Sequence, residues 1–285
     1  MMTGTKDKKI LHFILIPGAV AFGILLLGSL ISEILIRLVF QDRVGADVLF
    51  IMRYGFNIFC WFFLFIYCLI LEKPILKSFG HAKTGGMSGN TVRNLLFGFG
   101  LGLATNGTCA SIACIHGDLT FSVAGFSPVY LGIGLIAVLI QSGAEELLIR
   151  GYFMGVIESR YGAVWALVLN ALLFAGLHLG NPGITVLAIV RLLCISILYG
   201  LFVVRYKSLW MAIGMHTTWN YTQSLLLGLP NSGIVSERAL LHLDSSRGGF
   251  FYDEVFGLEG SVTALIVVIA LVAIVAFVPL GKKKG

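Results

Sequence analysis

The chain has 285 residues, of which 58% are hydrophobic and only 12% are charged, and its mean hydropathy is +0.94. Soluble globular domains carry about 25% charged residues, so this composition excludes a soluble protein and predicts an integral membrane protein. The formal net charge of +6 follows from the lysines placed around the expected membrane spans, so it does not indicate a nucleic-acid partner.

Eight apolar stretches reach the length of about 20 residues that a membrane-spanning helix requires. They lie at about residues 10–40, 48–71, 92–115, 128–157, 161–178, 184–204, 208–228 and 261–280. The first stretch is too long for a signal-peptide core and lacks a clear small-residue cleavage site, so we expect a retained helix. The sequence therefore predicts an all-α, polytopic helix bundle, with residues 1–285 forming a single integral membrane domain.

The lysines predict the orientation of this bundle. Eight spans with a cytoplasmic N-terminus place every lysine on the cytoplasmic side, as the positive-inside rule requires: Lys6, Lys8, Lys9, Lys73, Lys77, Lys83, Lys207, Lys282, Lys283 and Lys284. The opposite loops hold most of the acidic residues. We therefore expect both termini in the cytoplasm and contacts between the terminal lysines and anionic lipids. Short loops and the absence of organelle targeting favour a prokaryotic cytoplasmic membrane.

Two adjacent glutamates, Glu145 and Glu146, lie within the fourth predicted span. An ionised carboxylate near the bilayer centre costs a few kcal/mol or more, so intramembrane acids usually face a cavity and serve a function. Arg150 follows Glu146 by four residues, which places the two on one helix face as an ion pair. Glu145 is rotated about 100° from Glu146 around the helix, so the two acids can have different roles.

Two later spans carry further polar groups that match these acids. The fifth predicted span ends with Phe174 and His178, and the seventh contains His216 and Asn220 four residues apart. Each histidine alone is explained by a structural role, such as a hydrogen bond between helices. Glutamate, histidine and a histidine–asparagine pair on three helices of one small bundle instead predict a single catalytic site.

This set of side chains is sufficient for peptide hydrolysis without a covalent intermediate. Glutamate and histidine can take the proton from a water that attacks an amide carbonyl. A second histidine and an asparagine amide can donate hydrogen bonds to the developing oxyanion. A zinc site formed by Glu145, His178 and His216 is an alternative, although the His-Glu-x-x-His helix motif is missing. The five cysteines form no Cys-x-x-Cys pair, so neither disulfides nor a cysteine metal site is expected.

These segments resemble the CPBP family, which contains the CAAX proteases and bacteriocin-processing enzymes and is also called the Abi family. Its three motifs, Glu-Glu-x-x-x-Arg, Phe-x-x-x-His and His-x-x-x-Asn, match here at residues 145–150, 174–178 and 216–220. The resemblance covers a core of about residues 128–228. It implies an intramembrane endopeptidase with eight helices. The family was long described as metalloproteases, and the later reading is a glutamate mechanism, from which we expect no cofactor or metal. In family terms Glu145 and His178 activate water, His216 and Asn220 stabilise the oxyanion, and Glu146, Arg150 and Phe174 support the site.

The expected partner is a membrane-embedded peptide or protein substrate. It can be a prenylated CAAX tail, a bacteriocin or signalling-peptide precursor, or a C-terminal sorting segment, and the prokaryotic setting favours an unprenylated one. Two other functions compete: a non-enzymatic immunity or scaffold protein, and a transporter that relays protons through the paired glutamates. The transporter is weakened by the absence of inverted repeats or paired broken helices. Three further arginines near spans, Arg37, Arg53 and Arg191, are expected to snorkel or to pair with carboxylates.

Overall fold

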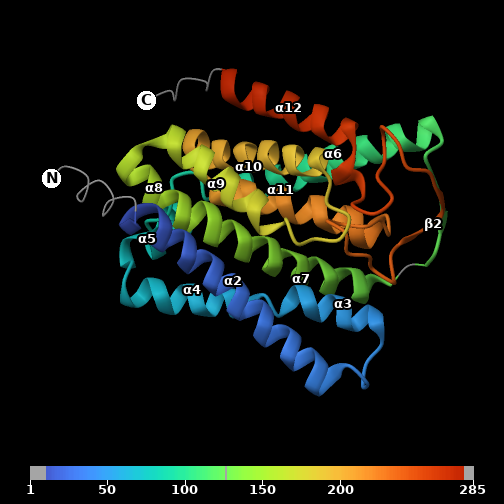
Figure 1. The fold of residues 1–285 in the computed structure, drawn as a ribbon, viewed down its shortest axis with the longest axis horizontal. Coiled ribbons are helices and arrows are strands. Elements are labelled where there is room, and N and C mark those ends of the chain that lie inside the picture. Colours follow the sequence, from blue (N-terminus) through green and yellow to red (C-terminus); the bar gives the residue numbers. More distant parts are fainter. Residues whose placement is uncertain (1–10, 126, 279–285) are drawn as a thin grey trace.

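The computed structural model describes residues 11–125 and 127–278, and these form an all-α bundle with one small sheet (Figure 1). The N-terminal half contains η1 (Leu11–Leu15), α2 (Ile16–Leu35), η2 (Ile36–Phe40), α3 (Ala46–Gly55), α4 (Ile58–Ile70), α5 (Lys73–Ser78), η3 (Ala82–Thr84), α6 (Val92–His116) and β1 (Leu119–Val123). The C-terminal half contains α7 (Pro128–Glu146), η4 (Leu147–Phe153), α8 (Met154–Tyr161), α9 (Ala163–Leu177), α10 (Val186–Tyr206), α11 (Leu209–Tyr221), η5 (Thr222–Leu226), β2 (Leu241–Ser246), η6 (Leu258–Gly260) and α12 (Val262–Phe277).

The predicted polytopic helix bundle is confirmed. Within the described residues, five helical segments are long and apolar enough to cross a membrane: 13–40, 46–70, 92–116, 128–161 and 186–206. The predicted fifth and eighth spans are present as shorter apolar helices, α9 and α12. The predicted seventh span is the helix formed by α11 and η5, which is more polar because it carries the site residues. Large exposed hydrophobic side chains on α2, α4 and α6 provide lipid-facing surfaces.

Helix starts follow the local capping chemistry of the sequence. A serine or threonine hydroxyl accepts a hydrogen bond from the backbone N–H three residues later at the start of five long helices. This satisfies one of the backbone donors that a helix start leaves open. The capping residues are Thr91, Ser127, Thr185, Ser208 and Ser261.

Helix α11 lies at the centre of the bundle and packs against α6, α7 and α10. Two glycines of α6, Gly98 and Gly102, let its backbone approach α11 closely. A Cβ atom at either position would clash with a backbone oxygen of α11, from Met211 or Met215. Such close helix contacts through small residues are typical of membrane bundles. They fix the position of the helix that carries His216 and Asn220.

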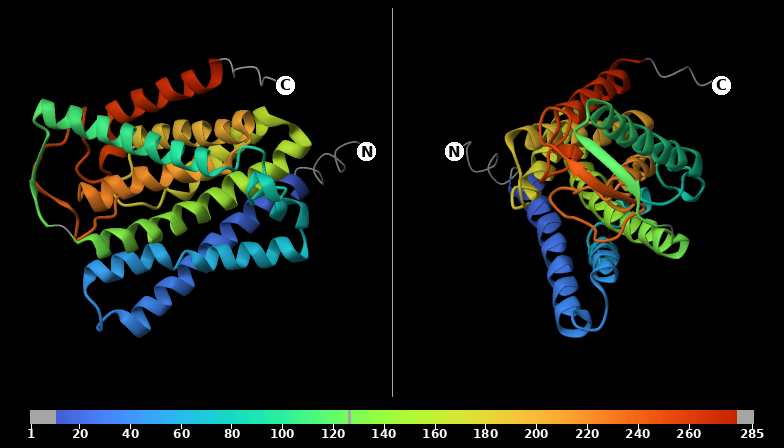
Figure 2. Two further views of the ribbon diagram at one scale, coloured as in Figure 1. Left: turned by 180° about the vertical axis from the view of Figure 1, so that it is seen from behind. Right: turned by 90° about the vertical axis from the view of Figure 1, so that its right-hand side faces the viewer.

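The helices α2, α3 and α4 form a layer against α7, while α12 covers the opposite side of the bundle (Figure 2). The first helix, α2, crosses this layer obliquely. The hydrogen bond from the Gly89 amide to the Lys207 carbonyl joins the loop before α6 to the α10–α11 turn. Lys73, Lys77, Lys83 and Lys207 therefore gather at one end of the bundle. The remaining lysines, Lys6, Lys8, Lys9 and Lys282 to Lys284, lie outside the described residues.

A two-stranded antiparallel sheet closes the other end of the bundle, between segments expected to be loops. Strands β1 and β2 pair from Leu119 opposite Ser246 to Val123 opposite Leu241, with a bulge after Thr120. The loop that follows β2 folds back against the helices and buries Tyr252, Phe256 and Leu258. This long segment between α11 and α12 therefore covers the end of the bundle and brings Glu259 into the core.

Candidate active site

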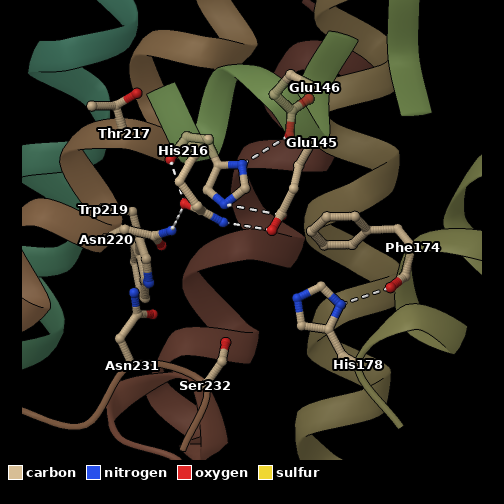
Figure 3. A network of polar contacts seen from close by, with 12 residues as sticks. Glu145, Glu146, Phe174, His178, His216, Thr217, Trp219, Asn220, Asn231 and Ser232 are labelled. Carbon is tan, nitrogen blue, oxygen red and sulfur yellow. Dashed lines mark hydrogen bonds and ion pairs between the residues drawn. The ribbon is translucent and has the colours of Figure 1, made fainter. Parts of the chain in front are cut away.

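The four residues predicted to be catalytic line one cavity of about 410 Å³ in the core of the bundle. Glu145 is in the last turn of α7, His178 directly follows α9, and His216 and Asn220 are on α11. In Figure 3, Glu145, His216 and Asn220 lie together on one side, and His178 points in from across the gap. The structure thus brings together side chains that are up to 75 positions apart in the sequence.

Glu145 has one carboxylate oxygen that accepts a hydrogen bond and one that, among the described residues, accepts none. Its Oε1 accepts a hydrogen bond from Gln141 Nε2 at 2.5 Å. Its Oε2 is buried and has no hydrogen-bond partner among the described residues. Gln141 also accepts a hydrogen bond from Asn220 Nδ2, at 3.3 Å. The Gln141 amide therefore fixes the acid relative to the asparagine and leaves Oε2 available to accept a proton.

His216 lies between the two glutamates. Its Nδ1 is 2.9 Å from Glu146 Oε1, and its Nε2 is 3.9 Å from Glu145 Oε2. The ring of Tyr199 stacks on the imidazole, with ring centroids 5.5 Å apart. Because the Glu146 carboxylate can only accept, Nδ1 carries the hydrogen and donates it. The Nε2 atom that faces the cavity can then donate a hydrogen bond only when the imidazole is protonated.

His178 is oriented by the residue that begins its motif. Its Nδ1 is 2.8 Å from the backbone oxygen of Phe174, four residues earlier. That carbonyl belongs to the last turn of α9, where backbone oxygens lack partners within the helix. Since a carbonyl only accepts, Nδ1 donates and Nε2 of the neutral ring keeps a lone pair. The Phe174 ring lies 4.7 Å from the imidazole and packs against it.

Glu146 and Arg150 form a fully buried ion pair behind the cavity. Arg150 Nη1 donates to Glu146 Oε1 at 3.0 Å, and Nη2 donates to Ser196 Oγ at 2.7 Å. The guanidinium also stacks over the Phe174 ring, 4.2 Å from its centroid. Neither Glu146 nor Arg150 is among the residues that line the cavity. Their contacts reach it indirectly, because Glu146 holds His216 and Arg150 packs on Phe174.

A π-helical segment begins directly after the two glutamates. All seven residues of η4 are buried, including Arg150. Such turns inside α-helices are frequent at functional sites, because the extra residue per turn redirects side chains. Here the turn lies between the acids at the end of α7 and the polar contacts of Arg150 with α10.

Sequence reasoning overlooked several polar partners of the site. Gln141, Ser196 and Tyr199 are polar positions within apolar spans, so their presence in the core was detectable, but their partners were not.

The three arginines expected to snorkel or pair all have carboxylate partners. The pairs are Arg37 with Glu33 at 2.7 Å, Arg53 with Glu33 at 3.5 Å, and Arg191 with Glu259 at 2.8 Å.

The side-chain arrangement also bears on the alternative zinc site formed by Glu145, His178 and His216. Among residues 11–125 and 127–278, no three His, Cys, Asp or Glu side chains are grouped in a way that could hold a metal ion. The residues present therefore do not fit a zinc site, and no step below passes through a metal.

The fold and the cavity define a multi-pass helical membrane protein with a glutamate–histidine centre in its core. Residues 127–222, about a third of the chain, match the family model described as Type II CAAX prenyl endopeptidase Rce1-like, so this segment is similar to the CAAX proteases. In general terms, this match indicates a CAAX-type intramembrane endopeptidase. No curated protein matches the sequence.

Proposed function

We propose that the protein hydrolyses a peptide bond of a membrane-associated peptide or protein with a water activated by Glu145 and His178. The observation that carries this proposal is Oε2 of Glu145, which has no hydrogen-bond partner among the described residues. Glu145 lines the same cavity as both histidines and Asn220. A buried carboxylate oxygen that accepts no hydrogen bond is costly unless it has a ligand or a chemical task.

The chemistry follows from which atoms are engaged. Glu145 Oε2 takes a proton from water, and His178 Nε2 can accept a hydrogen bond from the same water. The oxygen attacks the scissile carbonyl carbon, whose C=O electrons move to oxygen. The second N–H of the Asn220 amide and a protonated His216 Nε2 donate to that oxyanion. The proton held by Glu145 then passes to the departing amine nitrogen as the C–N bond breaks.

The proposal is tested by comparing membrane peptides from host cells with wild type, Glu145→Ala or His178→Ala. We expect the same uncleaved precursors to accumulate in both variants, which separates an enzyme from a scaffold. Equal insertion and abundance of the three proteins are the required control. Identical peptide profiles in all three strains would show that the cavity does not cleave a substrate of that membrane.

Chelation tests the zinc version of the same protease. Because the proposed base is a carboxylate, purified enzyme in detergent should keep most of its activity in EDTA and 1,10-phenanthroline. Elemental analysis should find no stoichiometric zinc. Activity and one zinc per chain that are lost together and restored together would instead support a metalloprotease.

A further inference from the structure

A second polar cluster lines the same cavity and is not used by the proposed hydrolysis. It is centred on Arg191, in the second turn of α10, and on Glu259 from the loop before α12. Arg191 is 2% exposed and Glu259 is 3% exposed. Arg191 Nη1 donates to Glu259 Oε1 at 2.8 Å. Removing two charges from water costs free energy, so an ion pair buried at this cavity is expected to have a role beyond stability.

The Glu259 carboxylate is saturated by the protein. Its Oε1 accepts from Arg191 and, at 3.1 Å, from the indole Nε1 of Trp219. Its Oε2 accepts a hydrogen bond from the Ser232 hydroxyl. The Trp219 ring also lies beneath the guanidinium, 4.4 Å from its central carbon. Glu259 and Trp219 thus hold the guanidinium in one orientation.

Arg191 is not saturated. Its Nε and Nη2 are buried and have no hydrogen-bond partner among the described residues. These two nitrogens form one edge of the guanidinium plane, with parallel N–H bonds. That edge matches the two oxygens of a carboxylate, which is the geometry of strong bidentate pairs. A buried donor left without a partner is unfavourable, so the open edge is a candidate ligand site.

We infer that the Nε–Nη2 edge of Arg191 binds a carboxylate of the substrate, either its C-terminal α-carboxylate or an Asp or Glu side chain. This inference rests on the proposed peptidase function for the identity of the ligand. It identifies a recognition group that lies apart from the groups that perform hydrolysis. Glu259 and Ser232 belong to the segment after residue 222, outside the matched family region.

The position of Arg191 along α10 sets the spacing between carboxylate and scissile bond. Tyr199, which stacks on His216, is eight residues further along the same helix. Eight residues of α-helix rise about 12 Å. An extended peptide covers this with about three to four residues at roughly 3.3 Å each. We therefore expect the recognised carboxylate three to four residues beyond the bond that is cut.

The test uses a quenched-fluorescent peptide with a prenylated cysteine, the substrate type named in the matched family description. Three forms are compared: a free α-carboxylate three residues after the cysteine, the matching α-carboxamide, and the carboxamide with glutamate at that third position. For wild type we expect kcat/KM for the free acid to exceed that for the amide by about 10- to 100-fold, as a charged hydrogen-bonded pair allows. If the glutamate restores kcat/KM of the carboxamide peptide, Arg191 binds a side-chain carboxylate. If it does not, Arg191 binds the C-terminal α-carboxylate.

Two variants probe Arg191 itself. Arg191→Lys keeps the charge for Glu259 but loses the fork, and it should bring the acid-to-amide ratio close to one. Arg191→Met combined with Glu259→Gln removes the pair without stranding a charge and should do the same. Arg205→Gln is the matched control on the same helix, because Arg205 binds the Val275 and Val278 carbonyls outside the cavity. It should keep the wild-type ratio.

A binding measurement separates this inference from the proposed function. Fluorescence anisotropy with Glu145→Gln protein reports peptide binding without turnover. Preferential binding of the acid that disappears when Arg191→Lys is added supports the subsite, even if wild type cleaves none of the peptides. Equal binding of acid and amide, or a preference that survives both Arg191 variants, overturns the subsite even if cleavage is observed. Loss of the preference in Arg53→Gln alone, the other arginine at the cavity, would also overturn it.

Discussion

Two buried arginine–glutamate pairs in this protein have opposite relationships to the cavity. Arg150 and Glu146 lie four residues apart on one helix, and neither lines the cavity. Arg191 and Glu259 are 68 residues apart in sequence, and both line it. Among the described residues, Arg150 uses both terminal nitrogens on protein groups and leaves only Nε without a partner, whereas Arg191 leaves both Nε and Nη2, a whole edge, open. A buried ion pair can therefore hold the side chains of a site in place without lining the cavity, or it can present a donor to a ligand. The open guanidinium edge distinguishes the second kind of pair from the first.

Two sets of side chains line the same cavity. Glu145, His178, His216 and Asn220 carry the proposed proton transfers and oxyanion contacts, and Arg191 presents its open edge. We expect substitutions in the first set to change the rate of hydrolysis, and substitutions of Arg191 to change which peptide is preferred.

The largest expected effect is loss of turnover in Glu145→Gln. Glutamine is nearly isosteric and can still accept from Gln141, but it cannot take a proton, so the rate should fall by about 10²–10⁴-fold or more. His178→Ala should lose activity to a similar extent. Peptide cleavage is measured beside the size-exclusion profile in detergent. Glu158→Gln is the control, since Glu158 pairs with Lys207 at the far end of the bundle and should keep full activity.

A smaller loss is expected for Asn220→Ala. Removing one oxyanion donor typically costs about 10²–10³-fold in kcat, which leaves weak cleavage that a sensitive assay can detect. Because Asn220 also donates to Gln141, Asn220→Asp serves as a second test that keeps the size but removes the donor. If Asn220→Ala retained wild-type kcat, Asn220 would not be an oxyanion donor.

The ion pair behind the cavity should influence stability more than specificity. Arg150→Ala leaves Glu146 buried without its cation and should destabilise the protein by about 3–5 kcal/mol, with reduced abundance. Adding Glu146→Gln should recover part of this loss. Thermal unfolding in detergent measures both variants.

The free-acid peptide should raise the Tm of wild type but not of the Arg191→Met, Glu259→Gln protein, because a ligand stabilises the state it binds.

The smallest effect is expected at the sheet that closes the bundle, where Arg247 binds Asp118 at 2.9 Å. Desolvation alone would raise the pKa of Asp118, but hydrogen bonds from Arg247 and His116 outweigh it, and the pKa lies below its usual value. A lowered pKa adds stability above the unfolded-state value of about 3.9, and this stability is lost as the pH falls through the folded-state pKa. Asp118→Asn should lower the Tm slightly at pH 7 and not at pH 2. A Tm difference that is the same at both pH values would contradict this role.

Much of the site could be predicted from local sequence. The cost of charge in hydrocarbon singles out Glu145 and Glu146, and the spacing of four residues pairs Glu146 with Arg150 on one helix face. The same spacing places His216 and Asn220 together. Apolar stretches of spanning length predict the helices, and hydroxyl side chains mark their starts. These features depend on contacts within one helix or on transfer to the membrane, so the sequence alone determines them.

Only the tertiary structure decides how the helices meet. The Gln141 bridge between Glu145 and Asn220 depends on how α7 packs against α11. The tautomer of His216 depends on Glu146, 70 residues away, and that of His178 on where α9 ends. Arg191 and Glu259 are single charges in distant segments, with no spacing that links them. They become a pair because the chain after α11 folds back over the bundle, and long-range contacts of this kind leave no periodic signal in the sequence.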